Sequence, residues 1–350
     1  MAGTATAPAR PPGDERLGRR SPLRRLLGRP ELGALIGAIV LFAFFSAVAD
    51  AFRQAGSFST VLYASSTFGI MAVGVSLLMI GGEFDLSAGV MVTTSALVAA
   101  LVSYQLTLNV WAGVAVSLAV TLALGFLNGL LYVRTGLPSF IVTLATFFML
   151  AGANLGVTKA VTGNVASDSV RDMDGFASAR SLFASSVDIG GVNVSVTVFW
   201  WLAFVAVATW LLLRTRPGNW IFAVGGAADA ARAVGVPVAR TKIALFMGVA
   251  LCAWFLGMHL LFSYATVQSG EGVGNEFYYI ICAVIGGCLL TGGYGSAVGG
   301  AIGAFIFGMT NKGIVYAEWN PDWFRFFLGA MLLVATALNL VVRRRVERSG

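Results

Sequence analysis

Two carboxylates stand two residues apart in the segment GGEFDLSAG, which separates two long apolar stretches. An acid in such a place either faces water in a tight turn or lines a polar cavity where a helix breaks at membrane depth. Asp85 followed by Ser87 can also cap the helix that begins next. Glu83, Asp85 and Ser87 are therefore candidate pathway residues, although a tight turn is the simpler interpretation of the same pattern.

A second polar segment, of mixed charge, lies near the middle of the chain. Its centre, Ala227–Val234, is predicted to be one short helix because alanine is the best helix former. Asp229 and Arg232 each lie at the helix end that suits their charge. Gly235 would end this helix, and Pro237 would prevent its continuation. A short helix with a surface of alanine methyl groups suits docking into a groove of another protein; the alternative is a plain solvated loop.

Residues that could carry catalysis or bind a metal are sparse. The chain has no GxxxxGK[ST] phosphate loop and no HExxH, GxSxG or CxxC motif. His259, the only histidine, lies in an apolar run and is predicted to be a packed interior group. Cys252, Cys282 and Cys288 also lie in apolar runs and are predicted to be reduced and buried. We expect no catalytic residue, no metal site and no cofactor in this chain, which should not be an enzyme.

The composition around these residues is that of a membrane protein. Hydrophobic residues make up 57% and charged residues only 11% of the 350 residues, and the mean hydropathy is +0.83. Soluble domains carry about 25% charged residues. The predicted fold class is therefore all-α, a polytopic membrane protein embedded in the lipid bilayer.

Ten apolar stretches in the sequence are long enough to cross the ~30 Å hydrocarbon core of a bilayer as helices. They fall near residues 32–52, 59–80, 87–105, 109–133, 139–158, 193–213, 242–264, 277–292, 296–313 and 325–342. One membrane domain over residues 31–343 is expected. Both ends of the chain should lie on the same side, because the number of spans is even.

The distribution of positive charge predicts the orientation. Placing both termini inside leaves 17 of the 23 Lys and Arg residues inside and 6 outside. The positive-inside rule therefore assigns both termini and the central loop 214–241 to the cytoplasm. The Arg-rich residues 1–30 are then a disordered basic cytoplasmic tail rather than a nucleic-acid-binding segment. Residues 344–350 form a second cytoplasmic tail.

The segment 159–192 is the longest polar connection between two spans and falls outside in this topology. A loop of this length inside a compact protein is usually functional or disordered. A functional outer loop would most simply receive a soluble partner, and a solvated connection is an equal alternative.

Glycines cluster between the eighth and ninth spans. The pattern Gly299-x-x-x-Gly303 lets two helices approach closely. This zone is predicted to serve helix packing, through Gly286, Gly287, Gly292, Gly293 and Gly295.

Four stretches, in order along the chain, resemble one protein family. GGEFDLSAG is similar to the signature turn of the permease subunits of bacterial sugar-type ABC importers, the relatives of ribose, xylose, galactose and inositol permeases. LPSFIVTLATFFMLAG is similar to the family's fifth span, GNWIFAVGGAADAARAVGV to its coupling segment, and EFYYIICAVIGGCLLTGGYGSAVGGAIGA to its C-terminal block. Together these matches cover most of residues 59–313.

The resemblance implies a type II-like importer fold of about ten transmembrane helices in the bacterial inner membrane. It also implies the partners: two cytoplasmic ATPase subunits, which bind ATP and Mg²⁺, an extracytoplasmic substrate-binding protein, and a second permease chain, identical or paralogous. On the family's EAA…G pattern, Asp229 stands where many members have Glu. The ATPase-coupling residues implied in this way are Gly226, Asp229, Ala230, Ala231, Arg232 and Gly235.

The implied function is import of a pentose, hexose or polyol that the binding protein delivers. The two spans that flank the coupling segment are expected to be rigidly continuous with it and to transmit its movement. Asn128, Thr143 and Asn154 are polar groups within spans, either on the pathway or, more simply, in hydrogen bonds between helices. Alternative functions are an ABC permease for branched-chain amino acids or nucleosides, and a self-contained secondary carrier.

Overall fold

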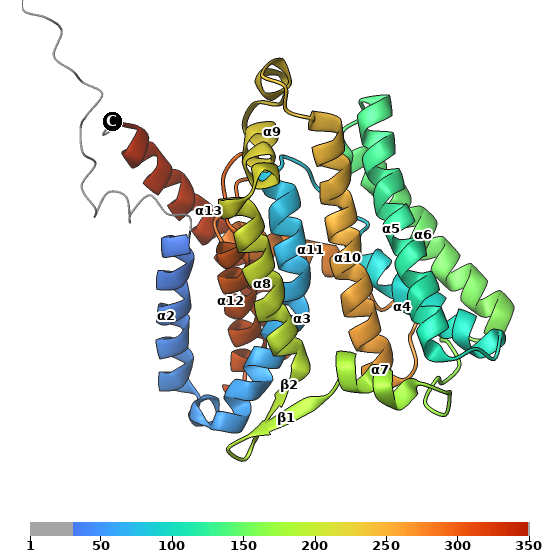
Figure 1. Ribbon diagram of the computed structural model, residues 1–350. Helices are drawn as coiled ribbons and strands as arrows, with labels where there is room; N and C mark the ends of the chain where they lie inside the picture. Colours follow the sequence, from blue (N-terminus) through green and yellow to red (C-terminus); the bar gives the residue numbers. More distant parts are fainter. Residues whose placement is uncertain (1–30, 349–350) are drawn as a thin grey trace, which may run out of the picture.

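The computed structural model describes residues 31–348, with side chains described to residue 337, as a bundle of helices with one small hairpin (Figure 1). Among the described residues, eight helices are long and apolar enough to cross a membrane. They are α2 (Glu31–Val48), α3 (Ala55–Ile80), α4 (Ala88–Gln105), α5 (Val110–Thr135), α6 (Ser139–Thr162), α8 (Val196–Arg214), α10 (Val238–Tyr264) and α12 (Ala297–Tyr316). The prediction of an all-α polytopic membrane protein is confirmed.

The remaining elements are short, except for α9 and the last helix. They are η2 (Asp50–Arg53), α7 (Phe176–Phe183), β1 (Ser186–Ile189), β2 (Val192–Ser195), α9 (Arg216–Ala233), α11 (Asn275–Ile285), η3 (Pro321–Trp323) and α13 (Phe324–Arg348). The two strands pair antiparallel, with Val187 opposite Val194. Residues 1–30, the predicted basic tail, lie outside the described residues, whereas α13 runs through residues 344–348 of the predicted C-terminal tail.

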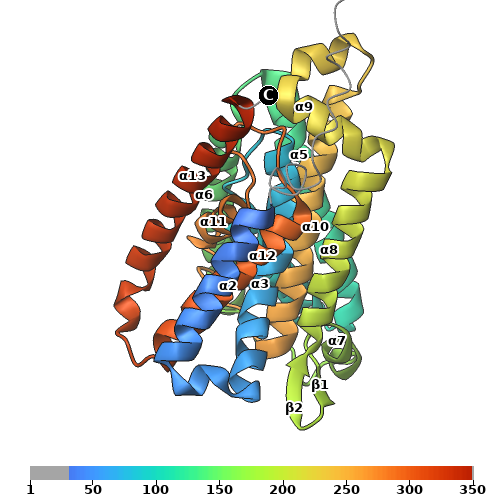
Figure 2. The same ribbon diagram turned by 90° about the vertical axis from the view of Figure 1, so that its left-hand side faces the viewer.

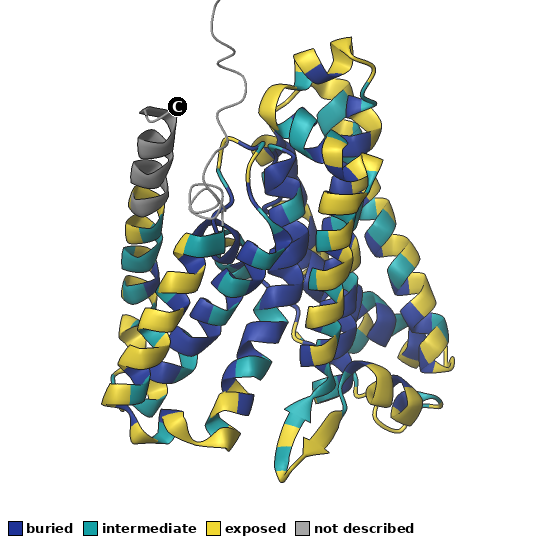
Figure 3. Ribbon diagram, turned by 60° about the vertical axis from the view of Figure 1, so that its left-hand side comes forward, coloured by how far each residue is buried: buried dark blue, intermediate teal, exposed yellow. Residues whose placement is uncertain are grey.

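Four helices form the centre of the bundle and four lie around it. In the most apolar stretches of α3, α4 and α10, 72% of residues are buried, and in α12 67%, against 17–33% in α2, α5, α6 and α8. Figure 3 shows the buried residues gathered in the middle of the bundle. The outer helices present large apolar side chains, such as Phe148 and Trp210, to their surroundings. An apolar exterior of this kind suits the hydrocarbon of a bilayer, where helices satisfy their own backbone groups.

The eighth predicted span, residues 277–292, is wrong as a membrane-crossing helix. Helix α11 has only 11 residues and ends at Ile285, so it is about 16 Å long at 1.5 Å per residue. The apolar sequence continues, but the backbone leaves the helix at a series of glycines with positive φ, including Gly287 (φ 94°) and Gly292 (φ 78°). The break is therefore set by glycine and not by hydropathy.

The segment 159–192 is folded and not an irregular loop. Helix α6 continues to Thr162, and α7 and strand β1 follow. Phe183 of α7 is buried and stacks on Phe262 of α10 at 5.8 Å between ring centroids. The backbone nitrogen of Val170 donates to the carbonyl of Ala265 at 3.0 Å. This segment is thus a packed cap over one end of the bundle.

The two ends of the bundle differ (Figures 1 and 2). One end, called here the α9 end, carries α9, the start of α2 and the last turn of α13. The opposite end, called here the hairpin end, carries α7 and the β1–β2 hairpin.

Candidate functional site

Helix α9 contains the predicted coupling residues except Gly235, which follows it, and exposes many of its residues at the α9 end (Figure 3). It begins with a cap, since the side chain of Thr215 accepts a hydrogen bond from the nitrogen of Gly218 at 3.2 Å. It ends where Gly235 takes a left-handed conformation, φ 84°. The nitrogen of Gly235 donates to the carbonyl of Arg232 at 3.1 Å, and that of Val236 to Ala231 at 3.0 Å. The prediction that Gly235 ends this helix is confirmed.

The predicted short helix that begins at Ala227 is present, as the second of two helical pieces that α9 joins across a kink. Ala227 lies at the kink, with φ −158° and ψ 87°, and the first piece covers the residues from Arg216, for which no helix was predicted from the sequence. The kink follows the Gly225–Gly226 pair, and the low helix propensity of glycine is the signal in the sequence that indicates it. The coupling segment is therefore the short last part of a kinked helix.

The expectation that the flanking spans are rigidly continuous with the coupling segment is wrong at the junction between α8 and α9. Thr215 is extended there, with φ −123° and ψ 156°, so α8 is not continuous with α9. On the other side, Pro237 separates α9 from the first residue of α10, Val238. The connection between α8 and α9 is therefore one extended residue long.

The last part of α9 exposes most of the predicted coupling residues. Asp229 and Arg232 form an ion pair at 3.0 Å with side chains 97% and 67% exposed, a geometry that contributes about 0–1 kcal/mol in water. Ala230 is exposed. Ala231 is buried and packs with Val224 and Val238. The segment is thus anchored by one alanine and open to a partner on its other faces.

Three glycine pairs from distant parts of the chain meet directly beneath α9. We call them the glycine junction: Gly81–Gly82 after α3, Gly225–Gly226 in α9, and Gly292–Gly293 between α11 and α12. The nitrogen of Gly293 donates to the carbonyl of Ile80 at 2.8 Å.

The backbones at the glycine junction are too close for side chains. A Cβ added to Gly225 would overlap the carbonyl oxygen of Ile80 and lie 2.7 Å from the nitrogen of Gly293. A Cβ on Gly292 would lie 2.6 Å from Cα of Gly82. Gly226, Gly292 and Gly293, predicted separately for coupling and for packing, therefore belong to one contact.

The other predicted packing glycines hold α11 against α12. A Cβ on Gly286 would overlap the carbonyl of Gly299, and one on Gly295 would lie 2.7 Å from the sulfur of Cys288. Gly287 has φ 94° and turns the chain at the end of α11.

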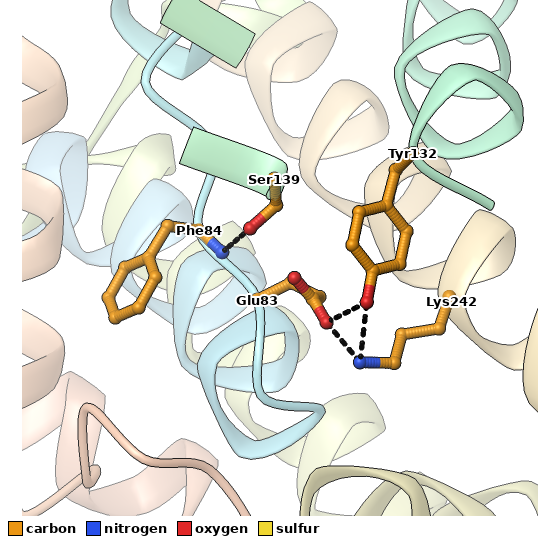
Figure 4. A network of polar contacts seen from close by, with 5 residues as sticks. All are labelled: Glu83, Phe84, Tyr132, Ser139 and Lys242. Atoms are coloured by element: carbon orange, nitrogen blue, oxygen red, sulfur yellow. Dashed lines mark hydrogen bonds and ion pairs between the residues drawn. The ribbon is translucent and has the colours of Figure 1, made fainter. Parts of the chain in front are cut away.

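Glu83 is one of the two acids of the GGEFDLSAG segment. It forms a buried ion pair with Lys242 of α10 (Figure 4). The side chains of Glu83 and Lys242 are 8% and 6% exposed. The hydroxyl of Tyr132, near the end of α5, donates to the same Glu83 oxygen at 2.6 Å. The next residue, Phe84, donates its backbone nitrogen to Ser139 at 3.2 Å.

Lys242 and Tyr132 were not among the predicted site residues. Lys242 had been counted with the cytoplasmic positive charges, and the only signal of its burial is its place at the start of a predicted span. Tyr132 stands in an apolar run that gives no signal. The ion pair and the Tyr132 hydroxyl join the segment after α3 to α5 and α10.

Asp85 and Ser87 lie deeper in the bundle than Glu83. Both are buried, and Asp85 accepts hydrogen bonds from the nitrogen and the hydroxyl of Ser87 at 2.8 and 2.5 Å. The second carboxylate oxygen of Asp85 is buried without a hydrogen-bond partner among the described residues. The preferred interpretation of this segment as a solvated tight turn is wrong, because it passes through the interior.

The three polar span residues hold this segment and its neighbours. Asn128 donates to the hydroxyl of Ser87 at 3.0 Å, and Thr143 accepts from the nitrogen of Leu86 at 3.0 Å. Asn154 donates to the carbonyl of Val90 at 3.4 Å. In the structure these three residues therefore make hydrogen bonds within the bundle, which was the simpler alternative to a place on the transport pathway.

No group of three potential metal ligands occurs in the described part of the chain. Cys252, Cys282 and Cys288 are free and buried. His259 is packed as expected, with hydrogen-bond contacts to the hydroxyl of Tyr63 at 3.1 Å and the carbonyl of Phe183 at 2.8 Å.

Comparison with known proteins gives a consistent result. The family model described as "Branched-chain amino acid transport system / permease component" matches residues 57–336. The ribose import permease protein of Escherichia coli (strain K12) is 31% identical over 286 residues, which cover 81% of this chain and 85% of that protein.

Two further relatives are similar over comparable lengths. The galactose/methyl galactoside import permease protein of Haemophilus influenzae is 28% identical over 86% of this chain and 91% of its own. The fructose import permease protein of Rhizobium meliloti is 26% identical over 89% of this chain and 85% of its own. No solved structure gives a significant match to this chain.

Proposed function

Since the chain belongs to the family of branched-chain amino acid transport system permease components, we propose that it is the membrane-spanning subunit of an ATP-driven sugar importer. The observation that carries this proposal is the similarity to permeases named for ribose, galactose and fructose over more than four fifths of the chain. The branched-chain amino acid permease is the second candidate, because the description of the matching family model names that substrate, but the relatives reported above are named for sugars. The secondary carrier has no such support.

The energy source in this proposal is a pair of ATPase subunits, which hold ATP and Mg²⁺. The chain has no phosphate loop, so it needs such a partner. The docking surface is the exposed last part of α9, with Asp229, Ala230 and Arg232 outward. Its small side chains suit a shallow groove, and its ion pair offers one charge of each sign.

Coupling proceeds from α9 through the glycine junction. Movement of α9 on the extended residue Thr215 displaces Gly225, which touches the backbone of Ile80 and Gly293. Those contacts carry the displacement to the segment 81–87 and to the segment between α11 and α12. Backbone contacts without side chains transmit displacement directly, because close-packed interiors leave no room to absorb it.

The proposed location is the bacterial cytoplasmic membrane, with the α9 end and both termini in the cytoplasm. This orientation follows from the excess of Lys and Arg in the segments at that end. The hairpin end then faces the binding protein, and the packed cap of α7 and the hairpin gives it an ordered surface. A second permease chain completes the pathway.

The test is reconstitution of the chain into liposomes with its ATPase and binding protein, followed by a panel of ribose, galactose, fructose, a polyol and leucine. We expect one sugar or polyol to stimulate ATP hydrolysis and to accumulate inside. Accumulation of leucine in place of every sugar would establish the second candidate. Uptake that persists without the ATPase would establish a secondary carrier.

A further inference from the structure

A cavity of about 520 Å³ opens near the hairpin end, between α3, α11, α12 and the start of α13. It is separate from α9, the glycine junction and the Glu83–Lys242 ion pair. Its lining residues are Phe68, Tyr278, Phe307, Asn311, Pro321, Asp322, Phe324 and Arg325. The volume lies within the range of about 300–1,000 Å³ that small-molecule sites occupy.

Four aromatic rings form the floor of this cavity. Phe68 of α3 lies 4.3 Å from Phe307 of α12, measured between ring centroids. Tyr278 of α11 and Phe324 of α13 lie 5.4 and 5.3 Å from the same ring. The rings come from four different helices, so the floor exists only in the folded chain.

Three planar polar side chains stand on the rim of the cavity: Asn311, Asp322 and Arg325. None of them makes a side-chain hydrogen bond or ion pair with another described residue. Asp322 and Arg325 carry opposite charges that remain apart, so the rim offers a carboxylate, an amide and a guanidinium with no net charge. These groups are available to a ligand.

The cavity reaches from the hairpin end to the middle of the bundle. Phe68 and Phe307 lie halfway along α3 and α12. Tyr278, which contacts Phe307, is in the first turn of the short helix α11. A helix that begins at membrane depth, with irregular backbone before it, is tolerated where it lines a cavity and is typical of transporter binding sites.

We propose that this cavity is a sugar-binding subsite on the outer half of the pathway, an inference that rests on the proposed function. The apolar face of a sugar ring packs on aromatic side chains. Its hydroxyls both donate and accept, and so suit an amide, a carboxylate and a guanidinium placed together. The subsite receives sugar from the binding protein and releases it inward.

The first test measures import by the reconstituted transporter of whichever sugar the wild type carries. Asp322→Asn and Asn311→Ala each remove one rim contact and should lower import at limiting sugar about tenfold, the loss expected for one hydrogen bond to a charged group or a well-placed amide. Asp50→Asn, an exposed carboxylate in η2 outside the packed cap, is the matched control and should import normally. Wild-type rates in both rim variants would overturn the subsite, whereas absence of any sugar import by the wild type would overturn the proposed function itself.

The second test measures occupancy without transport. The native cysteines are buried, so Asn311→Cys introduces a single accessible thiol in the full-length chain. A membrane-impermeant maleimide added from outside should label it, and the transported sugar at high concentration should slow that labelling. Labelling of Asp50→Cys should not respond to sugar.

Two outcomes of the labelling test would overturn the proposal. Equal labelling of Asn311→Cys with and without sugar would show that no sugar enters. Protection by leucine but not by sugar would assign the cavity to an amino acid, whose ammonium and carboxylate groups would then pair with Asp322 and Arg325.

Discussion

Lys242 and Glu83 lie 159 positions apart in the chain and pair in the interior, with Tyr132 completing the contact. Two charges removed from water are costly, and their attraction compensates only while both are present. The pair lies where the segment after α3 passes α5 and α10. Its role at the residue scale is to keep this segment in one position.

Removing one partner of the Glu83–Lys242 ion pair should destabilise the protein much more than removing both. We expect Glu83→Gln or Lys242→Met to destabilise the protein by about 3–5 kcal/mol, because each leaves an unpaired buried charge. The double variant should regain much of that stability. Thermal unfolding in detergent measures the effect, and Asp229→Asn, which breaks only the exposed pair with Arg232, should change stability by about 1 kcal/mol or less. A Glu83→Gln variant as stable as the wild type would contradict this account.

Gly225 should tolerate no side chain. In Gly225→Ala the new methyl group would overlap the carbonyl oxygen of Ile80, and α9 would have to separate from the glycine junction. We expect the variant to insert but to lose substrate-stimulated ATP hydrolysis. Gly248→Ala in α10, where a Cβ meets nothing within 4 Å, is the control and should retain it. Full stimulation in Gly225→Ala would remove the glycine junction from the coupling path.

At the scale of elements, α9 and α11 depart from the regular helices around them. Helix α9 breaks at Ala227, after a glycine pair, and α11 ends at Ile285, before another. In both cases an apolar or alanine-rich pattern favours a continuous helix, and glycines interrupt it. The interruptions bring backbone against backbone, which is how the glycine junction forms.

The end of α9 offers a test of docking. Gly235→Val forces a β-branched residue into φ 84°, a conformation that costs it at least about 1 kcal/mol. The last turn should reshape, so we expect loss of ATPase co-purification and of transport while membrane insertion persists.

A matched variant separates strain from docking. Gly136 ends α5 with φ 69°, and neither glycine has any atom within 4 Å of an added Cβ. Gly136→Val should therefore keep co-purification with the ATPase. If Gly235→Val kept it equally, α9 would not be the docking element.

At the scale of the whole molecule, the α9 end and the hairpin end must face opposite compartments. Exposed positions on each end report this directly, since the native cysteines are buried. Ala233→Cys on α9 should react with an impermeant maleimide only in opened cells. Val187→Cys on β1, which is exposed, should react in intact cells. The reverse pattern would invert the topology.

Hydropathy and the positions of glycines determined much of the fold that could be predicted from the sequence. The all-α membrane fold, the positions of most spans and the end of α9 at Gly235 all follow from local properties of the chain: apolar length, helix propensity and backbone freedom. These properties depend only on residues that are close together in the sequence, so the sequence alone reveals them.

Only the tertiary structure decided what those residues touch. Glycine pairs indicate where a chain can break, but not that three of them meet. A lysine at the start of a span indicates positive charge at the membrane surface, and only packing buries it against Glu83. The aromatic cavity beside α11 depends on four helices at once. Such contacts arise from long-range packing, which no local pattern encodes.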